Sequence, residues 1–529
     1  MNPNLLPWRL LFLWMCAAWL GGCTALPVKR PDAVQVSHAI AASEDTALGR
    51  IAAKSIPAPE LSGFRLLPLG SYSLDARLTL AERAQQTLDV QYYHIQNDET
   101  GRLFMRALRD AAARGVRVRL LLDDWYTSRE DGLLLALASH PNVELRLFNP
   151  FCCLREAGQL TRFIASVGDW NRVNHRMHNK LMVADGAMAV IGGRNVANEY
   201  YLRGALDNFI DLDAFVVGAV VADLSRIFDG YWNSDPVYPL QLIAKTDSPR
   251  EALQKFFDTA TSPLMTQLPT ELPPNDVLGY GPIREDLDAG QVGLIWGTAI
   301  ALADTPNKVM EAKGMLLMNS VTYNVLDNMR MAQQEVVVSS PYLVPGKPGM
   351  VWLREMAARK LKLQILTNSL ASTDEPSVHI GYSAYRPEML RLGIDLYELS
   401  SSRVMSNKRQ SMLFGKSQAR LHAKLVVIDR KTVFIGSMNL DPRSARLNTE
   451  MGLIIQSPQL ARELLRVIDI DKLQSAHRVR LAPNGTCCEW LTIDDDLSGE
   501  MILRTEPDSS FSMRFKTWLL SPFVPEQLL

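Results

Sequence analysis

The chain contains few of the residues that build metal centres. Six cysteines and eight histidines are spread over 529 residues. No C-x2-C pair and no H-E-x-x-H motif occurs, and spacings of this kind are the ones that typically hold zinc. The sequence therefore predicts neither a metal site nor a bound cofactor.

The chain also has no excess of charge of one sign. It carries 56 Lys and Arg residues against 57 Asp and Glu residues, a formal net charge of −1. A protein that coats nucleic acid is expected to be strongly basic. The total charge therefore gives no sign of a nucleic-acid partner, although totals hide local distribution and a basic groove stays open.

Long apolar runs are missing, and the one near the start of the sequence is short. Residues 10–20 are apolar and follow Arg9. A membrane-spanning helix needs about 20 apolar residues, whereas the apolar part of a signal peptide is shorter. The run ends in Leu-Gly-Gly directly ahead of Cys23, which resembles the bacterial lipobox.

These features predict a signal peptide at 1–22, a lipidated Cys23, and a polar, Pro-containing tether at 23–60. An uncleaved N-terminal anchor is the alternative. Both place the body of the protein outside the cytoplasm and against a membrane. The predicted location is the bacterial cell envelope, as a membrane-attached lipoprotein that faces the periplasm.

Apart from Cys16 and Cys23, the cysteines form two vicinal pairs, Cys152 with Cys153 and Cys487 with Cys488. An exported protein can oxidise such thiols. A disulfide between the two pairs is one outcome, and the sequence leaves it open.

One short pattern occurs twice in the chain. Residues 178–195 read HNKLMVADGAMAVIGGRN, and residues 422–439 read HAKLVVIDRKTVFIGSMN. Both have the spacing H-x-K-x4-D-x6-G-[GS]-x-N within apolar runs. A single H-x-K pair occurs by chance, but two copies with the same flanking residues indicate a site duplicated between two halves.

The surroundings of the motif repeat as well. In the first half, strand patterns at 88–93, 116–124 and 143–149 alternate with helix patterns at 101–115 and 132–139. In the second half, strand patterns at 335–343, 361–369 and 394–400 alternate with helix patterns at 350–359 and 384–392. This alternation predicts an α/β fold with mixed sheets in two similar lobes, 61–240 and 291–529. The Pro-rich stretch 241–290 is predicted to be a linker and surface excursion.

Each motif is itself predicted to form two strands. Side chains alternate along a strand, so His178 and Lys180 point to one face, and so do His422 and Lys424. An imidazole and an ammonium presented together suit proton transfer at a phosphate and binding of its oxygens.

The repeated motifs resemble the paired H-x-K-x4-D motifs of the phospholipase D superfamily. The continuations GGRNVANEYY and GSMNLDPRSARLNTEMG are similar to those of the cardiolipin synthase branch, C-type. The resemblance covers roughly residue 60 to the end. It implies two lobes that pair within the chain, with the active site at their interface. The first motif departs from the pattern at Gly193, where most members have Ser and where Ser437 stands in the second motif.

The resemblance implies catalysis through a phosphohistidine. His178 is expected to attack phosphorus, and His422 to protonate the leaving alcohol and then activate the acceptor. Lys180 and Lys424 would hold the phosphate oxygens, so that no metal is required. Asp185 and Asp429 complete the two catalytic motifs, although an Asp at a turn also suits a structural or orienting role.

Further residues follow the motifs. The predicted substrate-binding residues are Asn195, Ser437, Asn439 and Glu450. Glu450 could instead orient the histidine of the opposite half, with Asp213 as its counterpart. His175 is expected to be a bystander at the rim. His94, His379 and Lys308 could reach the pocket, but a surface position is expected for each.

Three function classes share these residues. The first is a phosphatidyltransferase that makes cardiolipin from phosphatidylglycerol and a second phospholipid. The second is a hydrolytic phospholipase D that releases phosphatidic acid, and the third is a phosphodiesterase or nuclease of the superfamily. The expected partners are a phospholipid substrate and a membrane surface, with no nucleic acid; the need for an accessory protein is left open.

Overall fold

The computed structural model of the chain describes residues 26–29, 35–152, 154–266, 272–309, 319–406, 417–485, 488–493, 500–526 and 529. The predicted signal peptide, Cys23, Cys153 and Cys487 lie outside these ranges, so lipidation and cysteine pairing stay predictions. Within the described ranges, no helix combines the length and the apolar character needed to cross a bilayer.

The later part of the predicted tether is packed against the first half of the chain. The backbone N–H of Ala39 donates to Asp229 at 2.8 Å, and Arg119 donates to the carbonyl of Ser37 at 3.0 Å. Helix α2 (Ala47–Ser55) follows, with Leu48 fully buried. From residue 35 onward, this segment therefore differs from the free tether expected from its composition.

The first half alternates strands and helices as the sequence pattern predicts. In chain order its elements are β1 (Ser62–Leu67), α3 (Gly70–Arg83), β2 (Thr87–Tyr92), α4 (Glu99–Ala113), β3 (Arg117–Asp123), α5 (Asp131–Ala138), β4 (Val143–Phe148), α6 (Gln159–Ala165), α7 (Trp170–Val173), β5 (Lys180–Ala184), β6 (Met188–Gly192), β7 (Asp207–Ile210), β8 (Asp213–Gly218), α8 (Val220–Trp232) and β9 (Val237–Pro239).

The predicted linker contains short helices. These are α9 (Leu240–Ile243), α10 (Arg250–Ala260) and α11 (Ile283–Asp288). Phe257 of α10 and Ile283 of α11 are buried in the core of the first half. This stretch is therefore packed on the first lobe at these two points.

The second half repeats the order of the first and adds a C-terminal extension. Its elements are β10 (Ile295–Ala303), α12 (Val321–Arg330), β11 (Glu335–Ser339), α13 (Gly346–Ala358), β12 (Lys362–Asn368), α14 (Pro376–Arg391), β13 (Asp395–Leu399), α15 (Ser401–Ser406), β14 (Gln418–Leu421), β15 (Leu425–Ile428), β16 (Thr432–Gly436), α17 (Pro442–Arg446), β17 (Met451–Gln456), α18 (Pro458–Ser475), β18 (Ala476–Leu481), β19 (Cys488–Ile493), β20 (Glu500–Leu503) and α19 (Phe511–Leu520).

Helix α4 shows how local sequence sets these elements. Asp98 caps its start, accepting a hydrogen bond from the N–H of Gly101 at 2.8 Å. Phe104 and Leu108, four residues apart, are fully buried on one face. The helix ends before Gly115, whose φ of +98° few other residues tolerate. The chain then enters β3 at a fixed angle.

The two lobes share one continuous sheet of 18 strands. Its spatial order is β9–β4–β3–β2–β5–β6–β8–β1–β10–β17–β16–β15–β11–β12–β13–β18–β19–β20. The first and second lobes meet where β1 pairs antiparallel with β10. Read outward from this junction, the two lobes present the same sequence of strands, which confirms the predicted pair of similar α/β lobes with mixed sheets.

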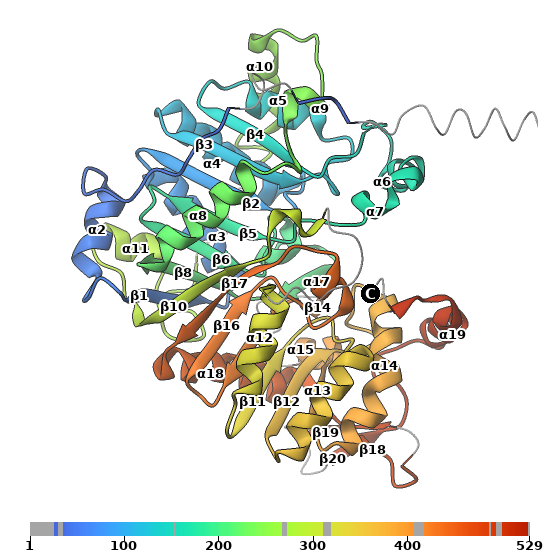
Figure 1. Cartoon of the computed structure of the whole chain (residues 1–529). Helices are drawn as coiled ribbons and strands as arrows, with labels where there is room; N and C mark the ends of the chain where they lie inside the picture. Colours follow the sequence, from blue (N-terminus) through green and yellow to red (C-terminus); the bar gives the residue numbers. More distant parts are fainter. Residues whose placement is uncertain are drawn as a thin grey trace, which may run out of the picture.

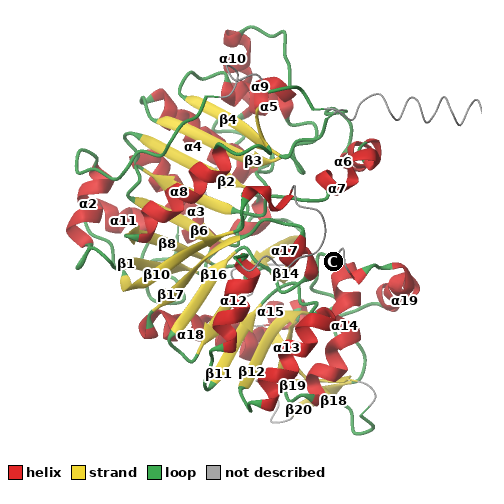
Figure 2. Cartoon of the chain, viewed as in Figure 1, coloured by secondary structure: helices red, strands yellow, loops and turns green. Residues whose placement is uncertain are grey.

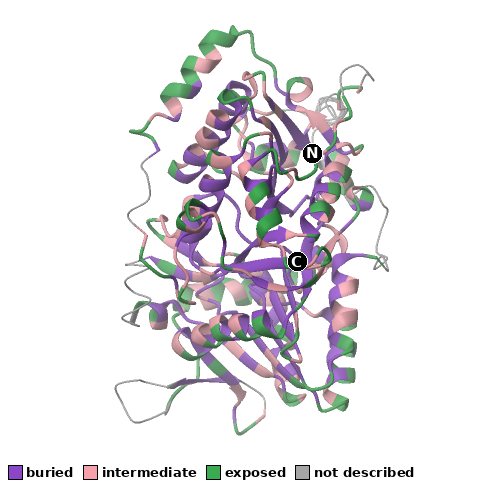
Figure 3. Cartoon of the chain, turned by 90° about the vertical axis from the view of Figure 1, so that its left-hand side faces the viewer, coloured by how far each residue is buried: buried purple, intermediate pink, exposed green. Residues whose placement is uncertain are grey.

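Figures 1 and 2 show the strands running as one band through both lobes, with helices on the two sides of the band. The central hydrophobic core also crosses the junction, because Ile191 of the first lobe and Ile435 of the second belong to one cluster of buried side chains. Figure 3 shows the strands buried along the middle of the molecule. The lobes are thus packed together as one body around the two motifs.

Candidate active site

Each H-x-K pair lies at the start of a β-hairpin. Lys180 is the first residue of β5, and Lys424 directly precedes β15. The first hairpin turns at Asp185 and Gly186, whose φ angles are 51° and 62°. The second turns at Asp429 and Arg430, whose φ angles are 49° and 54°. Two consecutive positive φ values are typical of a type I′ turn, which matches the twist of paired strands.

Asp185 and Asp429 lie at these turns, away from the histidines. Asp185 accepts hydrogen bonds of 2.8–3.1 Å from the backbone N–H groups of residues 85–87. Asp429 accepts bonds of 2.8–3.0 Å from those of residues 333–335. At about 3.3 Å per residue, β5 holds Asp185 roughly 15 Å from Lys180. The catalytic assignment of these two residues is therefore corrected to a structural one: they tie each hairpin to the start of its neighbouring strand.

His178 of the first motif is held by the second lobe. Its backbone N–H donates to the carbonyl of Thr449 at 2.9 Å, next to a strand bridge between Met177 and Thr449. Its Nδ1 lies 2.9 Å from Glu450 Oε2 and 3.1 Å from the carbonyl of Ser437. Glu450 is fully buried. Glu450 is therefore placed to orient the histidine of the opposite lobe, which is one of the two roles considered for it.

His422 of the second motif is held by the first lobe in the same way. Strand β14 pairs with β7 of the first lobe, and the His422 N–H donates to the carbonyl of Ile210 at 2.7 Å. Its Nδ1 lies 2.7 Å from Asp211 Oδ2, and Asp211 is buried. Two His–carboxylate pairs therefore cross the interface in opposite directions.

Asp211, and not Asp213, is the first-half counterpart of Glu450. Asp213 is fully buried and lies 3.0 Å from Arg77 Nη1 and 3.3 Å from Arg194 Nη1. Arg194 also donates to the carbonyl of Asp211. Asp213 thus supports the loop that carries Asp211. The orienting position predicted for Asp213 is occupied by Asp211, two residues earlier in the chain.

The two motif lysines are buried beside the histidines. Lys424 Nζ lies 2.9 and 3.1 Å from the two ring nitrogens of His422. Lys180 Nζ donates to the carbonyl of His178 at 2.7 Å and lies over the ring of Tyr93. Tyr93 also packs edge-on against the ring of His178. Each lobe thus contributes one imidazole and one ammonium.

Burial sets the protonation of this cluster. It lowers the pKa of His178 to about 4, although Glu450 opposes the shift. Burial and the charge of Lys424 lower the pKa of His422. Burial, with the charge of Lys424, lowers the pKa of Lys180 to about 7, and burial lowers that of Lys424 to about 8. At pH 7 the empty site therefore holds neutral His178 and lysines close to their titration points, which a phosphate anion would bring to the charged form.

Ser437, predicted to bind substrate, has its hydroxyl committed within the protein. It donates to Glu450 Oε2 at 2.5 Å and accepts a hydrogen bond from the N–H of Met451 at 3.0 Å. Glu450 receives a second hydroxyl, that of Ser444, at 2.8 Å. The predicted role of Ser437 is therefore corrected: it positions Glu450, which positions His178.

Asn195 and Asn439 lie next to this network. The side chain of Asn195 donates to the Tyr200 hydroxyl at 2.9 Å, and the Tyr200 ring packs against His422. The backbone N–H of Asn439 donates to the Ser444 hydroxyl at 3.2 Å. Within the described residues, the side-chain oxygen of each Asn is buried without a partner. The unused capacity of both amides beside the two His–carboxylate pairs is thus that of an acceptor oxygen.

The other singled-out residues fall in two groups. His94 stacks on Tyr126, and burial, together with the charge of Lys180, lowers the pKa of His94 to about 4, which places it near the site. His379 and Lys308 are buried, contrary to the expected surface positions. Lys308 Nζ donates to Asp304 at 2.7 Å, and Asp304 in turn accepts a hydrogen bond from the N–H of Glu450 at 3.0 Å. Lys308 therefore acts behind the site and does not reach a phosphate.

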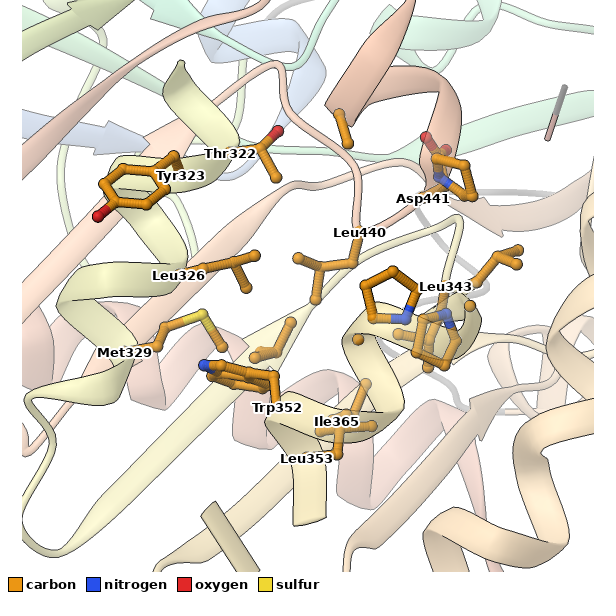
Figure 4. Close-up of a pocket in the computed structure, with 18 of the residues that line it drawn as sticks. Thr322, Tyr323, Leu326, Met329, Leu343, Trp352, Leu353, Ile365, Leu440 and Asp441 are labelled. Atoms are coloured by element: carbon orange, nitrogen blue, oxygen red, sulfur yellow. The ribbon is translucent and has the colours of Figure 1, made fainter. Parts of the chain in front are cut away.

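An apolar cavity lies beside the second motif. It has a volume of about 350 Å³ between α12 and α13 and is lined by Leu440 and Asp441, which follow Asn439. Figure 4 shows Leu326, Met329 and Trp352 around it. No histidine or lysine of the motifs lines this cavity. The crossed His–carboxylate pairs therefore lie outside the lining of this cavity.

Comparison with known proteins gives concordant results. A family model described as "Cardiolipin synthase, PLD-like domain" matches residues 78–232 and 325–471, one segment in each half. Cardiolipin synthase C of Escherichia coli (strain K12) is 39% identical over 480 residues, 88% of this chain and 96% of that protein. Cardiolipin synthase A of Pseudomonas fluorescens is 26% identical over 77% of this chain and 68% of that protein.

A solved structure shows the same fold. Phosphatidylserine synthase of Haemophilus influenzae Rd KW20 superimposes with a TM-score of 0.54 over 90% of this chain and 96% of that chain. The two sequences are 13% identical, so this likeness concerns the fold alone.

Fold, paired motifs and relatives together define a phospholipase D-type phosphatidyltransferase. The chain belongs to the cardiolipin synthase family with a phospholipase D-like domain. The relatives indicate a membrane-associated bacterial protein that acts on phospholipid.

Proposed function

We propose that this enzyme makes cardiolipin from phosphatidylglycerol and a second phospholipid through a phosphohistidine. The observation that supports the proposal most directly is the crossed arrangement of His178 with Glu450 and of His422 with Asp211. In each pair Nδ1 is occupied by a carboxylate of the other lobe. The Nε2 atoms are therefore the ones left to act on a substrate, one as nucleophile and one as acid and base.

His178 Nε2 attacks phosphorus of the donor phospholipid, and the bond from phosphorus to the headgroup oxygen breaks. His422 gives its proton to that oxygen, and the headgroup alcohol leaves, as glycerol from phosphatidylglycerol or as ethanolamine from phosphatidylethanolamine. A headgroup hydroxyl of phosphatidylglycerol then loses its proton to His422 and attacks the phosphohistidine, which gives cardiolipin and restores free His178. A bound phosphodiester carries one negative charge, which favours the imidazolium that His422 needs for the first step.

His178 is assigned the attack because, in the phospholipase D superfamily that the motifs resemble, the histidine of the first half is commonly the nucleophile. Lys180 and Lys424 balance the charge that develops on the non-bridging oxygens, and Asn195 and Asn439 contribute amide hydrogen bonds. Nucleophilic attack requires a neutral imidazole, and the pKa of His178, about 4, leaves it neutral at pH 7.

The histidine assignment is tested with a phosphatidyl ester of p-nitrophenol. This leaving group needs no proton, so His422→Ala is expected to release one burst of nitrophenolate and then stall. His178→Ala is expected to release none. A burst from His178→Ala alone would reverse the two roles.

The acceptor is tested with lipids of defined composition. The purified full chain is incubated with phosphatidylglycerol, with and without phosphatidylethanolamine, and the products are identified by mass spectrometry. Cardiolipin supports the proposal. Phosphatidic acid alone assigns water as the acceptor and a hydrolytic phospholipase D, and cleavage of nucleic acid without a lipid product assigns a nuclease. His175→Ala is the matched control, since His175 lies three residues before His178 and its ring bonds the carbonyl of Asn171.

The proposed location is the bacterial cell envelope, with Cys23 lipidated and the enzyme facing the periplasm. Its support is the short apolar run 10–20 followed by Leu-Gly-Gly-Cys. Metabolic labelling with a fatty acid is expected to mark the wild type and not Cys23→Ser. Absence of label from both proteins would leave the uncleaved anchor as the better account of attachment.

A further inference from the structure

Helix α19 and the 3-10 turn that follows it (Ser521–Phe523) carry an unusual number of exposed large apolar side chains. Phe511, Trp518 and Phe523 are 76%, 67% and 78% exposed. Phe515, Leu519 and Leu520 are exposed as well. Single exposed apolar residues are common on proteins, but a contiguous patch of them marks an interaction surface.

The apolar residues of α19 point away from the protein. Positions 511, 515, 518 and 519 share one helical face by their spacing. The helix packs beside α14, and its half-buried residues are Met513, Arg514 and Thr517. A helix that packs on a domain normally turns its apolar face inward. Here the outward face carries the aromatic rings, so folding alone does not account for it.

Both ends of this segment are fixed to the second lobe. Before the helix, Glu506 accepts a hydrogen bond from Arg386 at 2.6 Å, and Asp508 accepts one from Ser400 at 2.6 Å. After it, Leu529 is buried beside Val344 and Val378. The helix is therefore held in a fixed place between two anchors.

The second anchor reaches the active site. The N–H of Arg443 donates to the carbonyl of Leu529 at 2.6 Å. The guanidinium of Arg443 donates to Asn174 of the first lobe at 3.0 and 3.1 Å. Asn174 lies four residues before His178, and Arg443 lies four residues after Asn439. The position of α19 is thus tied to both catalytic motifs.

The first lobe has a smaller counterpart. Leu160 and Ile164 of α6 are exposed and lie four residues apart. Figure 1 shows α6 and α19 projecting from the same side of the molecule, one from each lobe, with β14 and α17 between them. The segment that contains α6 runs directly into α7 and then to His178.

We propose that the outward faces of α19 and α6 dock on the surface of a phospholipid bilayer and hold the active site against it. The inference deepens the proposed function, since it names the physical state in which the lipid substrate is met. Aromatic and leucine side chains enter the boundary between headgroups and acyl chains, to a depth of about 5–10 Å. Lys516 of α19 is exposed and matches anionic headgroups such as that of phosphatidylglycerol.

The first test separates docking from chemistry. The triple variant Phe515→Ala, Trp518→Ala, Phe523→Ala is prepared in the full chain. Its activity is measured on vesicles of phosphatidylethanolamine and phosphatidylglycerol, and on a short-chain phosphatidylglycerol dissolved as monomers. Activity on vesicles is expected to fall roughly tenfold or more, because three apolar anchors are lost, and activity on the monomeric lipid is expected to stay unchanged.

A matched control uses exposed apolar residues on other elements. The double variant Phe256→Ala, Leu473→Ala removes exposed side chains from α10 and α18. It is expected to behave as the wild type on both substrates. An equal loss of vesicle activity in this control, or an unchanged triple variant, overturns the inference. If neither the wild type nor any variant is active on the monomeric lipid, the result instead contradicts the proposed function.

The second test locates one side chain. The full chain holds ten tryptophans, so the fluorescence quenched by brominated lipid is compared between the wild type and Trp518→Phe. The wild type is expected to show an additional quenched fraction that the variant lacks, while vesicle activity stays within about twofold, because Phe keeps the apolar contact. Equal quenching of the two proteins, or vesicle-independent self-association through α19 seen by sedimentation, contradicts membrane docking.

Discussion

The two halves of the active site solve one task with different side chains. In one pair, Glu450 holds His178 and is itself held by the hydroxyls of Ser437 and Ser444. In the other, the shorter Asp211 holds His422, and Gly193 stands where the second motif has Ser437. A Cβ added at Gly193 would lie 2.2 Å from Asp211 Oδ1. The missing hydroxyl is thus not a loss: the space it would need is filled by the carboxylate.

The comparison teaches that equivalence lies in the histidine geometry and not in each residue position. Each histidine follows backbone that pairs with the other lobe, strand β14 before His422 and the single bridge at Met177 before His178, and both offer Nε2. The residues that hold the two histidines differ as pairs. Glu450 lies beside Ser437, whereas Asp211 lies beside Gly193.

The largest effect is expected from removal of either imidazole. His178→Ala and His422→Ala should each lower kcat by about a thousandfold or more, because nucleophile and acid-base act in one cycle. The measurement is cardiolipin formation on vesicles, with circular dichroism to confirm folding. Full turnover by one of the two variants would show that the halves do not share one site.

Replacement of the orienting carboxylates comes next. Asp211→Asn and Glu450→Gln keep the shape but favour the wrong tautomer of the histidine, so each should reduce kcat by roughly 10²–10⁴-fold. Asp213→Asn is the informative neighbour, because its partners are Arg77 and Arg194. It should mainly lower the melting temperature. A larger kcat loss in Asp213→Asn than in Asp211→Asn would return the role to Asp213.

The first motif has Gly193 where the second has Ser437, and each residue can be replaced by the other. Gly193→Ser should displace Asp211 and cost about 1–3 kcal/mol, as overpacked substitutions do, with a fall of at least about tenfold in kcat. Ser437→Gly removes one hydrogen bond from Glu450 and should cost about 1–2 kcal/mol. Rescue of Gly193→Ser by Asp211→Gly is not expected, since the swap leaves His422 without a carboxylate.

The turn aspartates should separate stability from catalysis. Asp185→Ala should lower the free energy of unfolding by about 1–3 kcal/mol, because the carboxylate is fully buried and its backbone partners would be left unpaired. Asp429→Ala should have a smaller effect, since Asp429 is only partly buried. Chemical denaturation measures the loss, and kcat of the folded fraction should stay near that of the wild type. A collapse of kcat at wild-type stability would restore the catalytic assignment.

The smallest effect concerns pH. His178 acts when neutral, and its pKa of about 4 places its protonation at the acid end of the kcat/KM profile of the free enzyme. Glu450 raises this pKa, so Glu450→Gln should shift that acid limb to lower pH while it lowers the plateau. A shift to higher pH in the variant would mean that Glu450 does not face His178 as a charged group.

Much of the fold followed from sequence patterns. Strands at 88–93 and 335–343 and the helices after them were predicted within a few residues of β2, β11, α4 and α13, because apolar periodicity reports the buried face. The single sheet across both lobes was not predicted, since pairing of β1 with β10 depends on contacts far apart in sequence.

The structure places the predicted histidines and lysines at the junction of the two lobes, with Glu450 beside His178 as one interpretation expected, whereas the Asp211 that lies beside His422 was not singled out. Asp211 and Asp213 lie two residues apart, and residues at that spacing share a face in a strand, so the pattern could not choose between them. The D-L-D run was the only available signal. Ser437 and Asp185 were misassigned because a motif letter does not reveal whether its oxygen is already bonded within the protein.

The crossing of the two pairs has a consequence for how the enzyme responds to dilution. Neither lobe holds a complete His–carboxylate pair of its own, so each depends on docking with the other. Because β1 and β10 belong to one polypeptide, the covalent link sets the local concentration of one lobe around the other. This effective concentration is on the order of millimolar for flexibly linked parts and higher for parts that are packed together. Specific activity should therefore be independent of protein concentration, where an equivalent pair of separate subunits would fall apart.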